Sequence, residues 1–363
     1  MAIAMPVVWS DRHRLHEPGG EVWVGVRTPG TEVPQRAEQI RVTLEEAGAS
    51  VVDAREHPEE ALLAVHDSAL IEYLKSAWEA WEASGLTRDP GQDRVVPYVF
   101  THPALLAGLR PASATATSAR AGQFAYDTMT LIGPGTWEAA RAAADVALTA
   151  ADLVIAGEPI AYACCRPPGH HAARGGFGGS CYLNNSALAA ARLREAIGEP
   201  VAVIDVDAHH GNGTQAIFYD DAELLTASVH VDPGAGWFPH FLGFESETGA
   251  GAGAGANRNA TLPPGSGDGA WLAAVATVAA WARERGARAL VIALGVDAAG
   301  GDPESPLEVT PRGFGDAGRA LGGLGLPTVA VQEGGYDLGT IGPLVAAALS
   351  GIEEGRSSAI RRG

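Results

Sequence analysis

Two carboxylates and two imidazoles lie within six residues of the chain, 205–210, directly after the apolar run at 201–204. A β-branched run without polar alternation is typical of a strand buried on both faces of a parallel sheet. In an extended segment every second side chain points the same way, so we expect Asp205, Asp207 and His209 to converge. These groups bind divalent metals, and open α/β sheets hold ligands at the carboxyl ends of their strands. The segment predicts part of a metal site; the alternative is capping aspartates and surface histidines in an ordinary loop.

Three further polar groups each follow an expected strand, so we expect them at the same rim of the sheet. The histidines at 170 and 171 are candidate ligands, a general acid/base pair, or two surface loop residues. An aspartate at 297 can complete a zinc site that leaves one position open for water. Paired glycines permit close backbone approach, and the tyrosine hydroxyl that follows them can donate to a developing oxyanion. The groups are His170-His171 after 160–164, Asp297 after 289–294, and Glu333-Gly-Gly-Tyr336 after 328–332.

The elements that position these groups alternate between strands and helices, which predicts one α/β domain over 1–363. Its sheet should be mainly parallel and covered by helices on both faces. Expected strands are 6–9, 51–53, 160–164, 201–204, 224–230, 289–294 and 328–332. Expected helices are 35–47, 59–81 with a break near 66–67, 136–156, 185–196, 271–285, 312–321 and 338–352. We expect loops at 11–31 and 249–255 and a long one at 85–117.

Composition narrows the function classes. The 363 residues are 46% hydrophobic and carry a net charge of −18, which argues against nucleic-acid binding and permits a cationic substrate. The three cysteines lack the spacing of a zinc ribbon or a redox pair, which favours a reducing compartment. The sequence contains no apolar run of membrane-spanning length, and its first residues lack the pattern of a secretory leader. We therefore expect a cytoplasmic protein without a membrane partner.

Five motifs occur together in an order that resembles the zinc-dependent histone deacetylase superfamily, and most of all its bacterial acetylpolyamine amidohydrolase branch. They are Arg166-Pro-Pro-Gly-His-His171, Cys181-Tyr-Leu-Asn-Asn185, the segment 205–215, Gly295-Val-Asp297 with Asp302-Pro303, and Glu333-Gly-Gly-Tyr336. Two more segments resemble the amidohydrolase branch in particular, Pro134-Gly-Thr-Trp-Glu-Ala-Ala140 and Phe238-Pro-His-Phe-Leu-Gly243. The resemblance implies the arginase/deacetylase fold, with an eight-stranded sheet.

The resemblance also implies a role for each matching residue. Zinc would be bound by Asp207, His209 and Asp297. His170 and His171 would be the acid/base pair, oriented by Asp205 and Asn212 respectively, and Tyr336 would polarise the substrate carbonyl. A structural potassium ion would lie near Asp205, Asp207, His209 and Ser228. The substrate channel would be lined by Phe177, Gly179, Ser180, Phe238 and Gly335.

The chain departs from the family pattern in the channel. Ser180 stands where an aromatic residue is expected, which should widen the channel. Polyamine-specific relatives place glutamates before the Pro-Gly-Thr-Trp segment, whereas here Asp127 is the acid within 121–131. Fewer acids would weaken recognition of a cationic chain. The 85–117 loop resembles one that forms a homodimer and narrows the entrance in that branch.

These features favour a zinc-dependent amidohydrolase that removes acetyl or short acyl groups from small amines such as acetylpolyamines. A protein acetyl-lysine deacetylase is the alternative, because it would share every catalytic residue. A binding module without activity should have lost Tyr336 or a metal ligand, and neither is lost. Arginase-like chemistry with two manganese ions would require more carboxylates in place of the tyrosine and the histidine pair.

Overall fold

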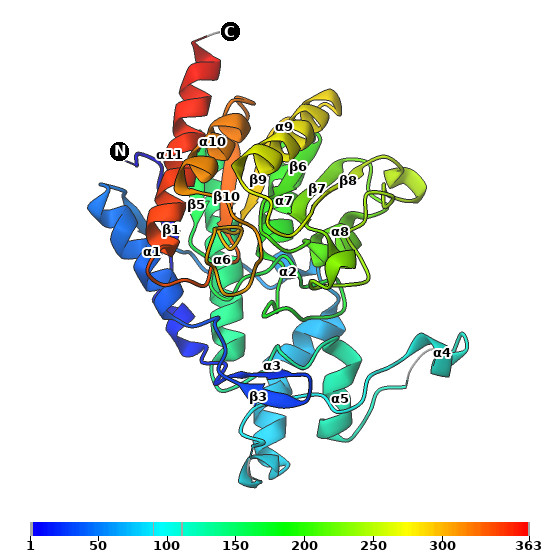
Figure 1. Ribbon diagram of the computed structural model, residues 1–363. Coiled ribbons are helices and arrows are strands. Elements are labelled where there is room, and N and C mark those ends of the chain that lie inside the picture. Colours follow the sequence, from blue (N-terminus) through cyan, green and yellow to red (C-terminus); the bar gives the residue numbers. More distant parts are fainter. Residues whose placement is uncertain (1–2, 90, 110–111, 362–363) are drawn as a thin grey trace.

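The computed structural model describes residues 3–89, 91–109 and 112–361. Its main sheet consists of β1 (Val7–Trp9), β4 (Val51–Asp53), β5 (Ile160–Ala163), β6 (Val201–Asp205), β7 (Leu224–Val231), β8 (Asn257–Leu262), β9 (Ala289–Leu294) and β10 (Thr328–Gln332). Every pairing is parallel, and the order is β4-β1-β5-β10-β9-β6-β7-β8 (Figure 1). The expected single α/β domain is confirmed, and so is the eight-stranded sheet that the resemblance implied.

Helices cover both faces of this sheet (Figure 1). One core lies under α1 (Gln35–Glu46), α9 (Asp268–Glu284), α10 (Pro311–Gly322) and α11 (Ile341–Ile360). The other core lies under α2 (Glu60–Leu63), α3 (Ser68–Ala83), α5 (Thr117–Phe124), α6 (Thr136–Ile155), α7 (Asn185–Ile197) and α8 (Asn212–Phe218). Successive residues of the central strand β6 enter opposite cores, with Ile204 in the first and Val203 in the second. This two-sided burial explains why the strand reads as an unbroken apolar run.

Several elements of the structure fall outside the sequence prediction, among them the helix α5 (Thr117–Phe124). The stretch 11–31 was expected to be a loop, but it contains an antiparallel hairpin of β2 (Glu21–Trp23) and β3 (Val26–Thr28). Its strands are only three residues long, too short to show a period, and β2 is held from outside by Thr128, whose carbonyl accepts from the Val22 N–H at 3.3 Å. The edge strand β8 and the short helix α8 were also not predicted.

The stretch 85–117 contains only short helical turns among its described residues, at Leu86–Arg88 and at α4 (Pro103–Leu106). In Figure 1 the segment around α4 projects away from the body of the domain. No helix in the described part of the chain has both the length and the apolar character needed to cross a membrane.

Candidate active site

Two histidines with different partners form the first part of the site. His170 and His171 follow β5 in a turn that the Arg166-Pro-Pro-Gly sequence forms, and their ring centroids lie 3.9 Å apart. Nδ1 of His170 lies 2.9 Å from the carboxylate of Asp205, the last residue of β6. Nδ1 of His171 lies 2.6 Å from the amide oxygen of Asn212, the first residue of α8. Both histidines are buried. These are the two pairings that the family resemblance implied.

The surroundings of the two imidazoles move their pKa values in opposite directions. Burial disfavours the charged form of His170, but the carboxylates of Asp207 and Asp205 outweigh it and raise its pKa to about 10. Burial, together with the positive charges of His170 and His209, holds the pKa of His171 well below its ordinary value. A carboxylate neighbour and an amide neighbour therefore give two adjacent histidines different protonation states at neutral pH.

Asp207, His209 and Asp297 form the second part of the site, and their ligand-type atoms all lie within 4.8 Å of one another. Nδ1 of His209 is 3.0 Å from Asp297 and 3.3 Å from Asp207. The backbone N–H groups of Gly334 and Ala208 donate to Asp207 and Asp297 at 2.7 and 2.8 Å.

This donor set fits a divalent metal. Two carboxylates and one imidazole are the ligand types of a catalytic zinc site with an open position. Both carboxylates are fully buried, and burial followed by repulsion from Asp207 raises the pKa of Asp297 to about 7. Buried carboxylates in contact need a cation or a proton. A metal ion at this point would satisfy them.

A surface cavity reaches these groups. It is lined by Glu21, Thr31, Met129, His171, Gly179, Ser180, His209, Phe238, Glu304 and Tyr336. The ring of Phe238 stands edge-on against His171, with centroids 4.8 Å apart. One cavity therefore exposes His171 of the pair, His209 of the metal cluster and Tyr336 to a ligand.

Three of the five expected channel residues line this cavity: Gly179, Ser180 and Phe238. The prediction was wrong for the other two. Phe177 is buried in the core beneath α3 and stacks against Tyr182, with ring centroids 5.7 Å apart. Gly335 is buried, and a Cβ there would meet Val296 at 2.6 Å. Neighbouring residues in an irregular loop face different sides, and no sequence period reveals which.

Sequence reasoning missed two acids in the cavity wall, Glu21 on β2 and Glu304 in the loop after β9. Burial, and then the charge of Glu304, raises the pKa of Glu21 to about 7. The hydroxyl of Thr31 donates to Glu304 at 2.7 Å. Asp127, the acid that the sequence pointed to, instead accepts from the backbone N–H groups of Gly179, Met129 and Thr130 at 2.6–3.0 Å. The carboxylate of Asp127 therefore fixes the backbone of its own turn and of the segment at Gly179.

Tyr126 is a further residue that the sequence reasoning did not single out. Its hydroxyl donates to the carbonyl of His171 at 2.8 Å and accepts from the Asn212 amide at 3.4 Å. Its ring lies nearly parallel to that of Phe238, with centroids 6.4 Å apart. An aromatic residue from another loop thus lies near the wall where the aromatic expected at Ser180 is absent.

Comparison with known proteins places this geometry in a family. A family model described as the histone deacetylase domain matches residues 30–352. The chain belongs to the histone deacetylase family.

Relatives within the family match over nearly the whole chain. The acetylpolyamine amidohydrolase of Mycoplana ramosa is 38% identical over 349 residues, which cover 96% of this chain and 99% of the relative. Acetylpolyamine amidohydrolase 1 of Pseudomonas aeruginosa is 39% identical, with coverage of 95% and 98%. The crystal structure of an acetylpolyamine aminohydrolase from Burkholderia pseudomallei superposes with a TM-score of 0.90 at 35% identity, covering 97% of this chain and 99% of the other.

The cavity wall predicts how a change at Ser180 alters acyl preference. Ser180 already has a Cβ at a φ of 62°, so replacement by tyrosine adds bulk to a side chain whose Cβ is already accommodated. We expect Ser180→Tyr to lower kcat/KM for a bulky acyl amine relative to the acetyl amine by about tenfold, or about 1.4 kcal/mol. Ser180→Ala, which keeps the space, should leave the ratio of the two kcat/KM values unchanged. An unchanged ratio in the tyrosine variant would show that this position does not set channel width.

Proposed function

We propose that the chain is a zinc-dependent amidohydrolase that removes acetyl or short acyl groups from small amines such as acetylpolyamines. One observation carries the proposal: a single cavity is lined both by His171, His209 and Tyr336 and by the carboxylates of Glu21 and Glu304. The first group suits hydrolysis of an amide, and the second suits an ammonium group elsewhere on the same substrate. The family membership and the named activities of the relatives support amide hydrolysis.

In this proposal Asp207, His209 and Asp297 hold zinc. When bound, zinc supplies a Lewis acid for the amide oxygen and lowers the pKa of water to near 7. His171 lines the cavity and has a lowered pKa, so it is neutral and placed to accept a proton from water and pass it to the departing amine. Asn212 orients this ring through Nδ1.

The remaining catalytic roles concern charge. His170, with its raised pKa, stays protonated against Asp205 and provides a fixed positive charge beside His171. The hydroxyl of Tyr336 donates to the developing oxyanion, a contribution typically worth about 3–4 kcal/mol. The amide partner thus leaves His171 neutral as the proton carrier, and the carboxylate partner keeps His170 charged as an electrostatic stabiliser.

Recognition of a cationic amine rests on Glu21 and Glu304. The sequence pointed to a shortage of acids before the Pro-Gly-Thr-Trp segment, and these two acids come from other segments of the chain. A protein acetyl-lysine deacetylase would share the catalytic residues, but the two acids in the cavity wall and the similarity to acetylpolyamine amidohydrolases favour the small amine.

We also propose a structural potassium ion near Asp205, Asp207 and His209. The support is that Asp205 and Ser228 are register partners on adjacent strands, which brings a buried carboxylate beside a buried hydroxyl.

A homodimer formed through the long loop at 85–117 is proposed as well. The side chains of Tyr98, Leu105 and Leu109 are 74%, 81% and 73% exposed. Exposed large apolar side chains on one projecting segment favour burial against another protein surface.

The substrate proposal predicts a preference that depends on the two acids. With zinc supplied, we expect kcat/KM for an acetylated diamine to exceed that for an acetyl-lysine peptide. Glu21→Gln or Glu304→Gln should lower kcat/KM for the diamine about tenfold, mainly through KM, because a hydrogen bond to a charged group contributes about 1.5–3 kcal/mol. An uncharged acetylated alkylamine and the exposed control variant Glu308→Gln should show no change. Preference for the peptide would favour the protein deacetylase instead.

The raised pKa of Glu21 predicts a pH dependence of substrate binding. A carboxyl with a pKa of about 7 is mostly neutral at pH 6 and mostly charged at pH 8, whereas an alkylamine stays protonated throughout. KM for the acetylated diamine should therefore fall as pH rises through 7. In Glu21→Gln this dependence of KM should be lost, and the KM of an uncharged amide should not show it in either protein. If the pH dependence of KM persists in Glu21→Gln, a group other than Glu21 causes it.

The metal cluster predicts one zinc ion per chain. A strong chelator should abolish activity and lower Tm, because the buried carboxylates of Asp207 and Asp297 then lose their counterion. Zinc should restore both activity and Tm. Asp297→Asn should reduce the zinc content measured by elemental analysis, while the exposed control variant Asp220→Asn should retain it. Two tightly bound transition-metal ions per chain would contradict a mononuclear site.

A further inference from the structure

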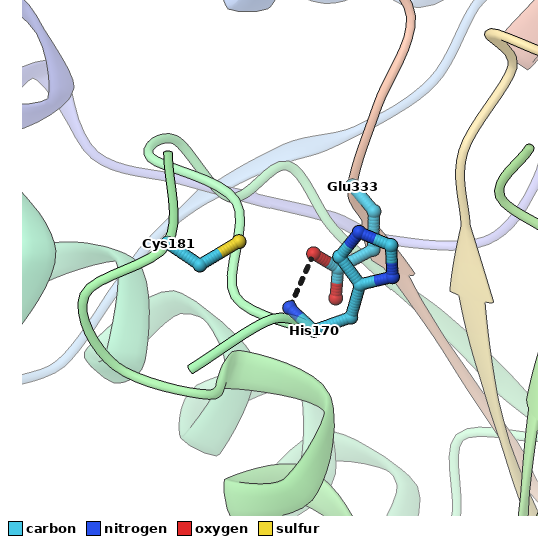
Figure 2. Close-up of side chains that lie close together, drawn as sticks. All are labelled: His170, Cys181 and Glu333. Carbon is cyan, nitrogen blue, oxygen red and sulfur yellow. Dashed lines mark hydrogen bonds between the residues drawn. The ribbon is translucent and has the colours of Figure 1, made fainter. Parts of the chain in front are cut away.

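A second group of ligand-type side chains lies behind the histidine pair. Atoms of His170, Cys181 and Glu333 lie within 4.8 Å of one another, and all three residues are buried. Figure 2 shows the Glu333 carboxylate beside the backbone of His170, with the sulfur of Cys181 directed toward them. The group has the composition of a metal site, so its hydrogen bonds decide what it does.

Those hydrogen bonds already use the carboxylate. One oxygen of Glu333 accepts from the backbone N–H of Gly169 at 2.6 Å. The same oxygen accepts from the backbone N–H of His170 at 3.0 Å (Figure 2). The other accepts from the hydroxyl of Ser186 at 2.6 Å. The ring nitrogen Nδ1 of His170 is directed at Asp205 instead. Glu333 is therefore a hydrogen-bond acceptor for the turn that carries His170 and His171, and its carboxylate oxygens are not free to bind a metal ion.

We propose that Glu333 is a positioning residue for amide hydrolysis, whose carboxylate anchors the turn that carries both catalytic histidines. This inference rests on the proposed function. The turn precedes α7 as an irregular segment, so its N–H groups need partners from elsewhere. Glu333 accepts from the N–H groups of the turn. Two carbonyls of the turn have other partners: that of His170 accepts from the Thr214 N–H at 3.1 Å, and that of Ala172 accepts from the Asn184 amide at 2.9 Å. The turn is thus held from both sides.

The backbone of Glu333 belongs to the loop after β10 that leads to Tyr336. Its N–H donates to the carbonyl of Leu294 at 3.0 Å, and its carbonyl accepts from the guanidinium of Arg36 at 2.6 Å. Arg36 also lies over the ring of Tyr336, 4.5 Å from its centroid. Glu333 therefore joins two loops that come from distant parts of the sequence, one with the histidine pair and one with the oxyanion donor.

A displaced turn should affect the chemical step more than substrate binding. A catalytic group that moves by 1 Å costs on the order of 100-fold in rate. The cavity residues that would bind the amine, Glu21 and Glu304, do not contact this turn through any hydrogen bond among the described residues. A loss confined to kcat is therefore the signature of a positioning role.

The test uses the full chain loaded with zinc and compares four variants. Glu333→Ala should lower kcat about 100-fold, with KM within about twofold and zinc content at the wild-type level. Glu333→Gln should recover kcat to within about tenfold of wild type, because its carbonyl oxygen can accept from Gly169 and His170 while its NH₂ group faces Ser186. Ser186→Ala should lower kcat only a few-fold. Asp268→Ala is the matched control, since Asp268 accepts from Thr310 in a similar way away from the histidine turn; it should leave kcat unchanged.

Each outcome can be read separately. Wild-type kcat in a folded, zinc-loaded Glu333→Ala protein would overturn the inference, and so would a glutamine variant as impaired as the alanine variant. If the alanine variant does not fold, Glu333→Asp replaces it, since it keeps the charge but withdraws the acceptor; kcat should fall at least tenfold, and a wild-type value would overturn the inference. A wild-type protein without turnover of any acetylated amine would refute the proposed function, and this inference with it. Wild-type turnover with unaffected variants refutes this inference alone.

Discussion

Negative charge buried at one rim of the sheet is the constraint on which the site depends. Asp205, Asp207 and Asp297 lie at or just beyond the ends of β6 and β9, and all are buried. A buried carboxylate is costly unless it is paired or hydrogen-bonded. Here the partners are backbone N–H groups and the imidazoles of His170 and His209. The excess charge that remains is suited to a small cation, which can bind and still leave an open coordination position.

Close packing of the chain makes these backbone hydrogen bonds possible. A Cβ on Gly295 would lie 2.0 Å from Asp207, and one on Gly334 would lie 2.5 Å from both Asp207 and Asp297. Any side chain at these two positions would push the loops away from the carboxylates. The N–H of Gly334 could then no longer donate to Asp207. Of the paired glycines that the sequence indicated for close approach, Gly334 therefore lies against the metal cluster itself, whereas Gly335 lies against Val296.

The rim could be predicted from sequence because its signals are local. Each apolar run of four to six residues was recognisable as a buried strand, and the polar residues after it had to meet at one edge. The cavity wall could not be predicted in this way. Glu21 reaches it through a hairpin with three-residue strands, which is tied to Thr128 by hydrogen bonds between segments about 100 residues apart. Phe177 was misplaced because its burial depends on packing against Tyr73 and Tyr182.

The difference between the predictable rim and the unpredictable cavity wall has a physical basis. Groups that move protons and hold a metal need tight geometry, and they lie at strand ends or in turns fixed by buried hydrogen bonds such as those of Glu333. Groups that select a substrate need only face the cavity, so they can come from whichever loop reaches it. In this chain Ser180 stands where an aromatic is expected, Tyr126 stacks on Phe238 in the cavity wall, and the acids come from β2 and the loop after β9. Substrate preference can therefore shift through these loops while the hydrogen bonds around the histidine pair and the metal cluster stay the same.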